Sequence, residues 1–167
     1  SYYLSQVLSS RYGKKNIVVV NNAIKDNFGN EAPVNEKNTV SYDMNYTHLS
    51  YIGTISTWID FALIKALINK FPNIVFHFYG PIDCKTYPTH ERMVFHGPVP
   101  HNQVKGVMET ADILVMPFIV NELIKSVNPV KLYEYIYTGK PCIAPLYGES
   151  KPFEEYVYLY KDSSECI

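Results

Sequence analysis

The sequence predicts an α/β fold with a mostly parallel sheet and helices on both faces. Short apolar runs alternate along the chain with segments whose apolar residues recur at helical spacing, which is the pattern of repeated strand–helix–strand units. The length of 167 residues and the hydrophobic content of 47% also suit a single domain with a buried core.

The predicted elements follow in chain order. Residues 1–12 are typical of a short helix, residues 16–20 (NIVVV) of a buried strand, and the polar residues 21–45 of a long loop. Further strands are predicted over residues 48–53, 74–80, 93–97, 113–118, 141–146 and 157–161. Further helices are predicted over residues 58–71, 101–111, 128–139 and 153–156. This alternation is Rossmann-like, and ligands of such sheets bind at the carboxyl ends of the strands.

Composition excludes several classes of function. Fifteen basic and 16 acidic residues leave a net charge of −1, so nucleic acid is not an expected partner. The three cysteines are far apart and form no CxxC pair, which indicates reduced thiols in a cytoplasmic protein. The longest uncharged apolar run, residues 113–120, is too short to span a bilayer, and the first residues lack a signal-peptide pattern. We therefore expect a soluble, cytoplasmic domain.

The segment over residues 121–144 carries the strongest functional signal. Asn128 suits a helix N-cap and Pro129 the first helical position, so this helix would begin at the mouth of the sheet. The free N–H groups and positive dipole end of such a helix form an anion site. Lys131 would add a formal charge for a diphosphate, and Glu134 lies one turn deeper, where it could accept the two hydroxyls of a ribose. The alternative is that Lys131 and Glu134 form an ordinary surface ion pair.

The run KLYEYIYTGKPCIA (residues 131–144) resembles the nucleotide-binding signature of GT-B-fold glycosyltransferases, in the group 1 and teichuronic-acid-type branch. YIGTISTWIDFALI resembles their strand, turn and helix near the diphosphate, and FHGPVPHNQV their base-proximal turn. The likeness runs in order from about residue 16 to residue 146. It implies that the chain is the C-terminal, nucleotide-sugar-binding half of a GT-B fold.

The resemblance also implies roles for individual residues. A phosphate-binding helix start and the loop before it would comprise Ser126, Val127, Asn128, Pro129, Val130 and Lys131, and Glu134 would bind the ribose. The resemblance places Gly97, Pro98 and Val99 near the base, and Gly53 and Thr54 beside the diphosphate or sugar. Pro81 is a further candidate because it lies at the carboxyl end of a predicted strand. Many group 1 enzymes have a glutamate where this chain has Ser126, and Glu122 is a candidate substitute for it.

Other chemistry finds no support in the sequence. The chain contains no GxGxxG fingerprint, no P-loop, no DxD pair and no HExxH spacing, so we expect neither a cofactor nor a metal. His77 and His96 lie within apolar strands and are expected to pack on the sheet.

The function implied is glycosyl transfer from a nucleoside-diphosphate sugar to an acceptor hydroxyl, in cell-surface polysaccharide synthesis. Residues 1–167 would form one donor-binding domain, inactive by itself, with the acceptor site and catalytic base in an N-terminal domain absent from this chain. The full-length enzyme could associate peripherally with a membrane. Two alternatives stay open: one half of a nucleotide-sugar epimerase, and a non-catalytic nucleotide-binding or receiver-like module. A receiver would need an acidic pair where Asn21 and Asn22 stand.

Overall fold

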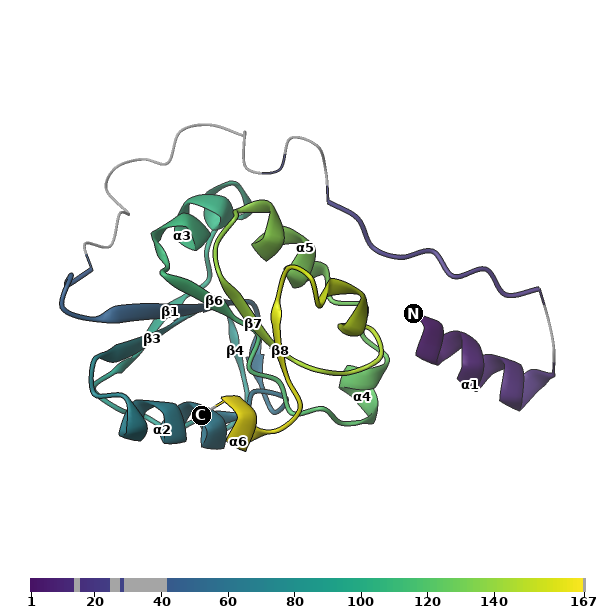
Figure 1. The fold of residues 1–167 in the computed structure, drawn as a ribbon, viewed down its shortest axis with the longest axis horizontal. Coiled ribbons are helices and arrows are strands. Elements are labelled where there is room, and N and C mark those ends of the chain that lie inside the picture. Colours follow the sequence, from purple (N-terminus) through teal and green to yellow (C-terminus); the bar gives the residue numbers. More distant parts are fainter. Residues whose placement is uncertain (14–15, 25–27, 29–41, 167) are drawn as a thin grey trace.

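The computed structural model describes residues 1–13, 16–24, 28 and 42–166. Its centre is a six-stranded sheet in the order β5-β3-β1-β6-β7-β8, with every neighbouring pair parallel (Figure 1). The strands are β1 (Thr47–Ile52), β3 (Ile74–Tyr79), β5 (Met93–Gly97), β6 (Ile113–Val115), β7 (Cys142–Pro145) and β8 (Tyr158–Tyr160). Two short strands outside this sheet, β2 (Ile55–Ser56) and β4 (Ile82–Asp83), pair with each other. The predicted parallel α/β fold is confirmed.

Helices cover both faces of the sheet. In Figure 1, α3 (Val104–Thr110) and α5 (Val130–Tyr137) lie on one side, and α2 (Phe61–Lys70) and α6 (Ser163–Cys166) lie on the other. A single-turn helix, α4 (Glu122–Lys125), stands near the carboxyl edge, and 3₁₀ turns occupy His101–Gln103 and Lys151–Phe153. None of the helices in the described part of the chain is long and apolar enough to cross a bilayer.

Helix α2 shows how local sequence sets the boundaries of an element. Apolar residues at helical spacing face the sheet, and four of them are buried: Leu63, Ile64, Leu67 and Ile68. The Asp60 carboxylate accepts a hydrogen bond from Leu63 N at 2.9 Å, so the helix begins after Asp60. The predicted start at residue 58 is therefore wrong, and Trp58 lies in the preceding loop.

The predicted strand at residues 16–20 is also wrong. Within the described part of the chain this stretch pairs with no strand, and the side chains of Val18 and Val20 are 82% and 83% exposed. A β-branched run satisfies strand propensity locally, but pairing and burial decide whether it becomes a strand. Of the predicted loop, residues 21–24, 28 and 42–45 lack helix and strand as expected, whereas residues 25–27 and 29–41 lie outside the described residues.

The first helix, α1 (Tyr2–Tyr12), confirms the prediction for residues 1–12 but buries none of its residues. It lies beside the domain in Figure 1. Tyr3 of this helix contacts the domain through two hydrogen bonds: its N–H donates to Glu149 at 3.1 Å and its hydroxyl donates to Glu122.

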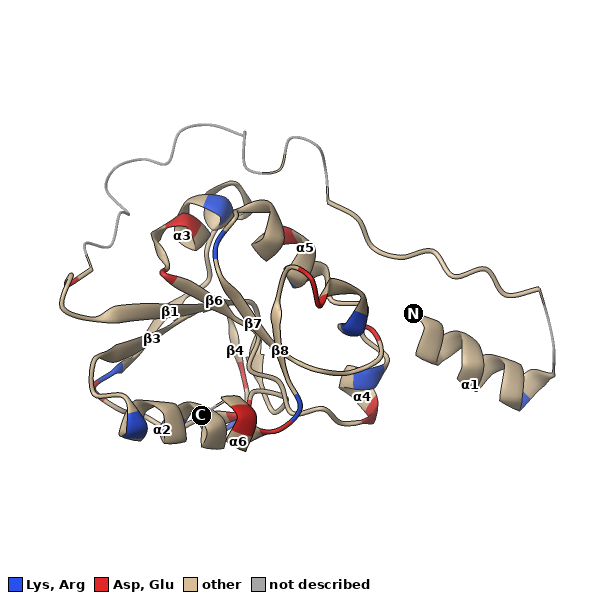
Figure 2. Ribbon diagram, in the orientation of Figure 1, with Lys and Arg blue, Asp and Glu red and all other residues tan. Residues whose placement is uncertain are grey.

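Charged residues of both signs lie close together on the surface. Figure 2 shows them on α3 and α4, in keeping with the net charge of −1.

Three imidazoles form a row across β1, β3 and β5. His48 Nδ1 lies 2.9 Å from His77 Nε2, and His77 Nδ1 lies 2.9 Å from His96 Nε2. His48 Nε2 lies 3.0 Å from the carbonyl oxygen of Asp43, which can only accept, so His48 carries its proton on Nε2 and the same tautomer follows along the row. The expectation that His77 and His96 pack on the sheet is confirmed.

Candidate functional site

The strand order creates a switch point at the centre of the sheet. From β1 the chain adds β3 and then β5 on one side, and afterwards β6, β7 and β8 on the other. The connections after β1 and after β6 therefore diverge, and in open α/β sheets ligands bind in the crevice at that place. Gly53 and Thr54 follow β1 directly, so the predicted site residues of this segment lie at the switch point.

The backbone at this edge is packed too tightly for side chains. A β-carbon on Gly80 would lie 2.6 Å from the carbonyl carbon of Gly53, and one on Gly53 would lie 2.6 Å from Lys131 Nζ. Both glycines also have positive φ, 149° at Gly53 and 144° at Gly80. Only glycine combines this backbone conformation with such close approach. The end of β1 and the first turn of α5 thus meet at Gly53.

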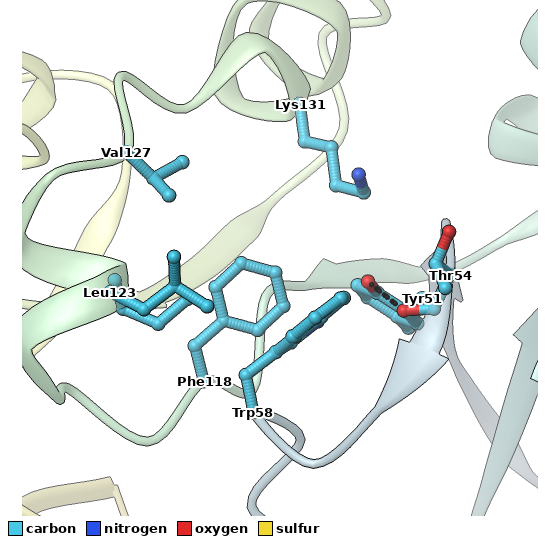
Figure 3. A pocket seen from close by; sticks show the side chains of 8 residues that line it. Tyr51, Thr54, Trp58, Phe118, Leu123, Val127 and Lys131 are labelled. Atoms are coloured by element: carbon cyan, nitrogen blue, oxygen red, sulfur yellow. Dashed lines mark hydrogen bonds between the residues drawn. The ribbon is translucent and has the colours of Figure 1, made fainter. Parts of the chain in front are cut away.

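Lys131 extends from α5 toward the end of β1. Its Nζ lies 5.8 Å from the ring centroid of Tyr51, and its side chain lines a cavity together with Thr54 (Figure 3). Burial lowers the pKa of Lys131 below its usual value, while Glu134 opposes that shift. A largely desolvated ammonium at a helix N-terminus is well placed to bind an anion.

Glu134 is half-buried one turn deeper in α5. Burial raises its pKa, and the charges of Lys131 and His101 act in the opposite direction. The ion pairs of the described residues join Lys105 to Glu109, Lys125 to Glu122 and Lys151 to Glu154, and Lys131–Glu134 is not among them. The alternative of an ordinary surface pair is therefore wrong for this helix.

The start of α5 differs from its prediction by one residue. The helix begins at Val130, Pro129 takes the cap position, and no side chain caps the helix. The side chain of Asn128 instead accepts a hydrogen bond from Asn22 N at 3.0 Å and donates to Glu149 at 3.4 Å. The predicted N-cap role of Asn128 is wrong. Its side chain links the loop before α5 to Asn22 and to Glu149. No side chain therefore caps the first N–H groups of the helix.

The other predicted residues lie around this centre. Gly97 ends β5, Pro98 and Val99 follow it, and Gly97 O accepts a hydrogen bond from Gly80 N at 2.8 Å. Pro81 is exposed, and its carbonyl oxygen accepts from Ile55 N at 2.9 Å. Ser126 donates to Leu123 O at 2.6 Å, whereas Val127 lines the same cavity as Lys131. The structure brings Gly53, Thr54, Val127 and Lys131 together, with the β5 residues further along the edge.

The cavity beside Lys131 has a volume of about 310 Å³. Its lining also includes residues to which the sequence assigned no individual role: Tyr51, Trp58, Phe118, Leu123 and Ile124. Glu122, the candidate substitute for a sugar-binding glutamate, is instead exposed, bonded to Lys125 and Tyr3, and does not line the cavity. In the described part of the chain, no group of three or more His, Cys, Asp or Glu side chains is placed to hold a metal ion.

Comparison with known proteins identifies the fold. No protein-family model matches the chain. WaaG, a glycosyltransferase involved in lipopolysaccharide biosynthesis, superimposes with a TM-score of 0.65 at 14% identity, over 96% of this chain and 48% of WaaG. The fold is that of a GT-B glycosyltransferase domain. The Anabaena protein Alr3699/HepE, solved in complex with UDP-glucose, has a TM-score of 0.50 at 17% identity, over 73% of this chain and 37% of its own.

A sequence relative agrees with the structural match. TuaH of Bacillus subtilis (strain 168), provisionally named a teichuronic acid biosynthesis glycosyltransferase, is 29% identical over 126 residues. The alignment covers 71% of this chain and 32% of TuaH. The chain thus spans about a third of TuaH and about half of WaaG.

Proposed function

We propose that this chain is the donor-binding domain of a glycosyltransferase that moves a sugar from a nucleoside-diphosphate sugar to an acceptor hydroxyl. The observation that carries the proposal is the convergence of Lys131 with the first turn of α5 and Gly53 at the switch point of the sheet. The similarity to TuaH, WaaG and HepE supports the same function. The resemblance to TuaH supports a place in cell-surface polysaccharide synthesis.

In this proposal each part of the edge has its own task. The N–H groups at the start of α5 and the ammonium of Lys131 bind the diphosphate and stabilise the charge that develops as it leaves. Glu134 accepts hydrogen bonds from the ribose, and Gly97, Pro98 and Val99 lie near the base. The role of Lys131 requires no metal, because the side chain and the helix dipole are fixed before the reaction begins.

The acceptor site and the catalytic base belong, in this proposal, to an N-terminal domain outside these residues. The greater lengths of TuaH and WaaG support that division. The described cysteines Cys84, Cys142 and Cys166 are free thiols, which fits the cytoplasm as the compartment of this domain.

Lys131→Ala tests the assignment of the diphosphate site. We expect the variant to lose about tenfold or more in affinity for the nucleoside diphosphate that the chain binds best among UDP, GDP, ADP and dTDP, with little change for the matching nucleoside. The reason is that a partly buried charge at a helix end contributes up to about 2 kcal/mol to anion binding. Isothermal titration calorimetry at low and high salt measures both affinities, and the difference should shrink as salt rises.

Lys65→Ala on the exposed face of α2 is the matched control, since it removes the same charge away from the site. Equal losses for nucleoside and diphosphate in Lys131→Ala would indicate a distorted pocket and contradict the assignment. Absence of binding to all four diphosphates by the unmodified chain would contradict the proposed function itself.

A further inference from the structure

The cavity beside Lys131 is built by segments far apart in sequence. Trp58 follows β2 and Phe118 follows β6, and the two loops are joined by a hydrogen bond of 2.8 Å from Ile119 N to Trp58 O and by a bridge between Ile59 and Phe118. Leu123 of α4 and Val127 form the wall opposite Tyr51 (Figure 3), and Ile124 of α4 also lines the cavity. The volume of about 310 Å³ lies at the lower end of the range of about 300–1,000 Å³ typical of small-molecule sites.

The polar atoms of the two largest aromatic side chains are already bonded within the wall. The Tyr51 hydroxyl donates to Thr54 O at 2.9 Å, and the Trp58 side chain lies close enough to interact with the same hydroxyl. Tyr51 and Trp58 therefore offer a ligand their ring faces and not their polar groups. Among the lining residues, the side-chain polar groups left for a ligand are the Lys131 ammonium and the Thr54 hydroxyl, and both lie at one end of the cavity (Figure 3).

The rest of the lining is unsuited to a sugar that carries a hydroxyl at every position. Phe118, Leu123, Ile124 and Val127 have no polar side-chain atom, and the lining contains neither a carboxylate nor an amide side chain. A hydroxyl buried against such a wall loses its hydrogen bonds to water without replacement, which is unfavourable. A methyl group at the same place gains from leaving water.

We propose that the cavity takes the glycosyl group of the donor and selects a sugar that bears a methyl group, as in a 6-deoxyhexose or an N-acetylhexosamine. This inference rests on the proposed function, because Lys131 fixes the diphosphate at the polar end of the cavity and the sugar attached to it must then lie within reach of the apolar wall. The shared chemistry is the methyl group, carried on C6 in one class and on the N-acetyl group in the other.

Calorimetric titration of the chain with matched donors tests the selection. The base is the one of UDP, GDP, ADP and dTDP that binds best. For uridine the probes are UDP, UDP-glucose, UDP-6-deoxyglucose and UDP-N-acetylglucosamine, and for another base the corresponding set. We expect at least one methyl-bearing donor to bind about tenfold or more tightly than the fully hydroxylated donor, which is within the discrimination that an apolar pocket achieves for one such group. The donor that gains identifies which methyl group the cavity takes.

Leu123→Gln adds a polar group to the wall. Leu123 is 56% exposed at the rim of the cavity, so the variant should fold, and we expect the preference for methyl-bearing donors to shrink while affinity for the free diphosphate stays the same. Ile119→Gln is the matched control: its side chain is 44% exposed and does not line the cavity, and the preference should persist.

The outcomes distinguish the selection of a methyl-bearing sugar from the proposed function. Binding of the free diphosphate together with equal or tighter binding of the fully hydroxylated donor would overturn the methyl selection and leave the proposed function standing. A preference for the methyl-bearing donor that is unchanged in Leu123→Gln would overturn the assignment to this cavity. Failure of every diphosphate to bind would overturn both.

Discussion

At the scale of single residues, the site depends on the absence of a side chain at Gly53. Its backbone approaches the end of Lys131, the hydroxyl of Tyr51 and the backbone of Gly80 at once. The glycine therefore sets where the ammonium lies, although it contributes no chemical group of its own. A sequence pattern shows that a glycine follows the strand, but it does not show which side chain occupies the space that the glycine leaves.

Gly53→Ala should disturb both stability and binding. The added β-carbon would lie 2.6 Å from Lys131 Nζ and 2.9 Å from Tyr51 Oη, at a φ of 149° that side chains rarely adopt. We expect a loss of about 1–3 kcal/mol in the free energy of unfolding from the backbone strain, and weaker diphosphate binding because Lys131 must move. Urea unfolding and calorimetry measure the two effects.

Gly148→Ala is the control for this substitution, because a β-carbon there meets no atom within 4 Å and the residue is not in the positive-φ region. In a Lys131→Ala background, Gly53→Ala should cost little further affinity, since the two changes act through the same ammonium. Additive losses in the double variant would contradict that coupling.

At the scale of elements, the row of imidazoles links three strands through groups that titrate. Burial lowers the pKa of His77 to about 3, and the neighbouring His48 and His96 act in the same direction. Tyr42 stacks on His48 with 4.1 Å between the ring centroids, and Tyr79 stacks on His96 with 4.2 Å between them. Aromatic rings therefore cover the row. Burial lowers the pKa of His96 as well.

The row should make the fold sensitive to acid. The unfolded chain takes up a proton at His77 near its ordinary pKa of about 6.5, whereas the folded chain does not until about pH 3. The unfolded state therefore binds more protons between these values, and stability falls as the pH drops below about 6.5. Between pH 7 and pH 5 we expect His77 to account for a loss of about 1–2 kcal/mol, measured by urea unfolding at each pH.

His77→Phe should reduce the loss in the free energy of unfolding between pH 7 and pH 5, because it keeps an aromatic ring and removes the titrating group. His90→Asn is a suitable control, since His90 lies outside the row and an amide oxygen can accept the hydrogen bond that its Nδ1 accepts from Arg92 N at 3.0 Å. An equal loss of stability at acid pH in His77→Phe and in the unmodified chain would show that His77 does not cause it.

The elements also show how far the sequence could predict this structure. Helix α2 and strands β1, β3 and β5 were predictable because apolar spacing reports burial within one element. The NIVVV segment was mispredicted because pairing involves residues elsewhere in the chain. The shared wall of Trp58 and Phe118 was not predicted for the same reason: the two residues come from separate loops, and only the contact between those loops brings them together.

The candidate site was predictable in part. Lys131 and Glu134 could be chosen from their spacing behind Asn-Pro, because a helix fixes which residues share a face. The N-cap assignment of Asn128 failed because Asn22 and Glu149 compete for its side chain, and local propensity contains no information about such distant partners.

At the scale of the whole molecule, the domain combines the proposed donor site with a helix, α1, that buries none of its residues. The aligned regions cover 32% of TuaH and 48% of WaaG, and helix α1 leaves large apolar side chains exposed, among them Leu4 at 45%, Leu8 at 44% and Tyr12 at 59%. Both observations are consistent with the proposed division of the reaction between a donor-binding domain and a separate acceptor domain.

We therefore expect the 167-residue chain to bind a nucleotide sugar without transferring it. The reason is that the proposed roles of its residues are donor binding and stabilisation of the leaving diphosphate, and the proposal assigns no general base to them. Release of nucleoside diphosphate, followed by a coupled assay with and without a simple sugar acceptor, should stay at background. A glycosyltransferase that contains both a donor and an acceptor domain is the positive control. Robust transfer by the 167-residue chain alone would contradict the prediction.

Trp58 has a further practical consequence, because it is the one tryptophan among the 167 residues and it lines the proposed sugar cavity. All of the indole emission of this protein thus originates beside the place where a donor would bind. A sugar packed against the indole face would change the polarity and quenching around it, so the intensity and wavelength of emission would report occupancy without any label. The chain carries its own fluorescent probe, and free diphosphate and intact donor should be distinguishable by light alone.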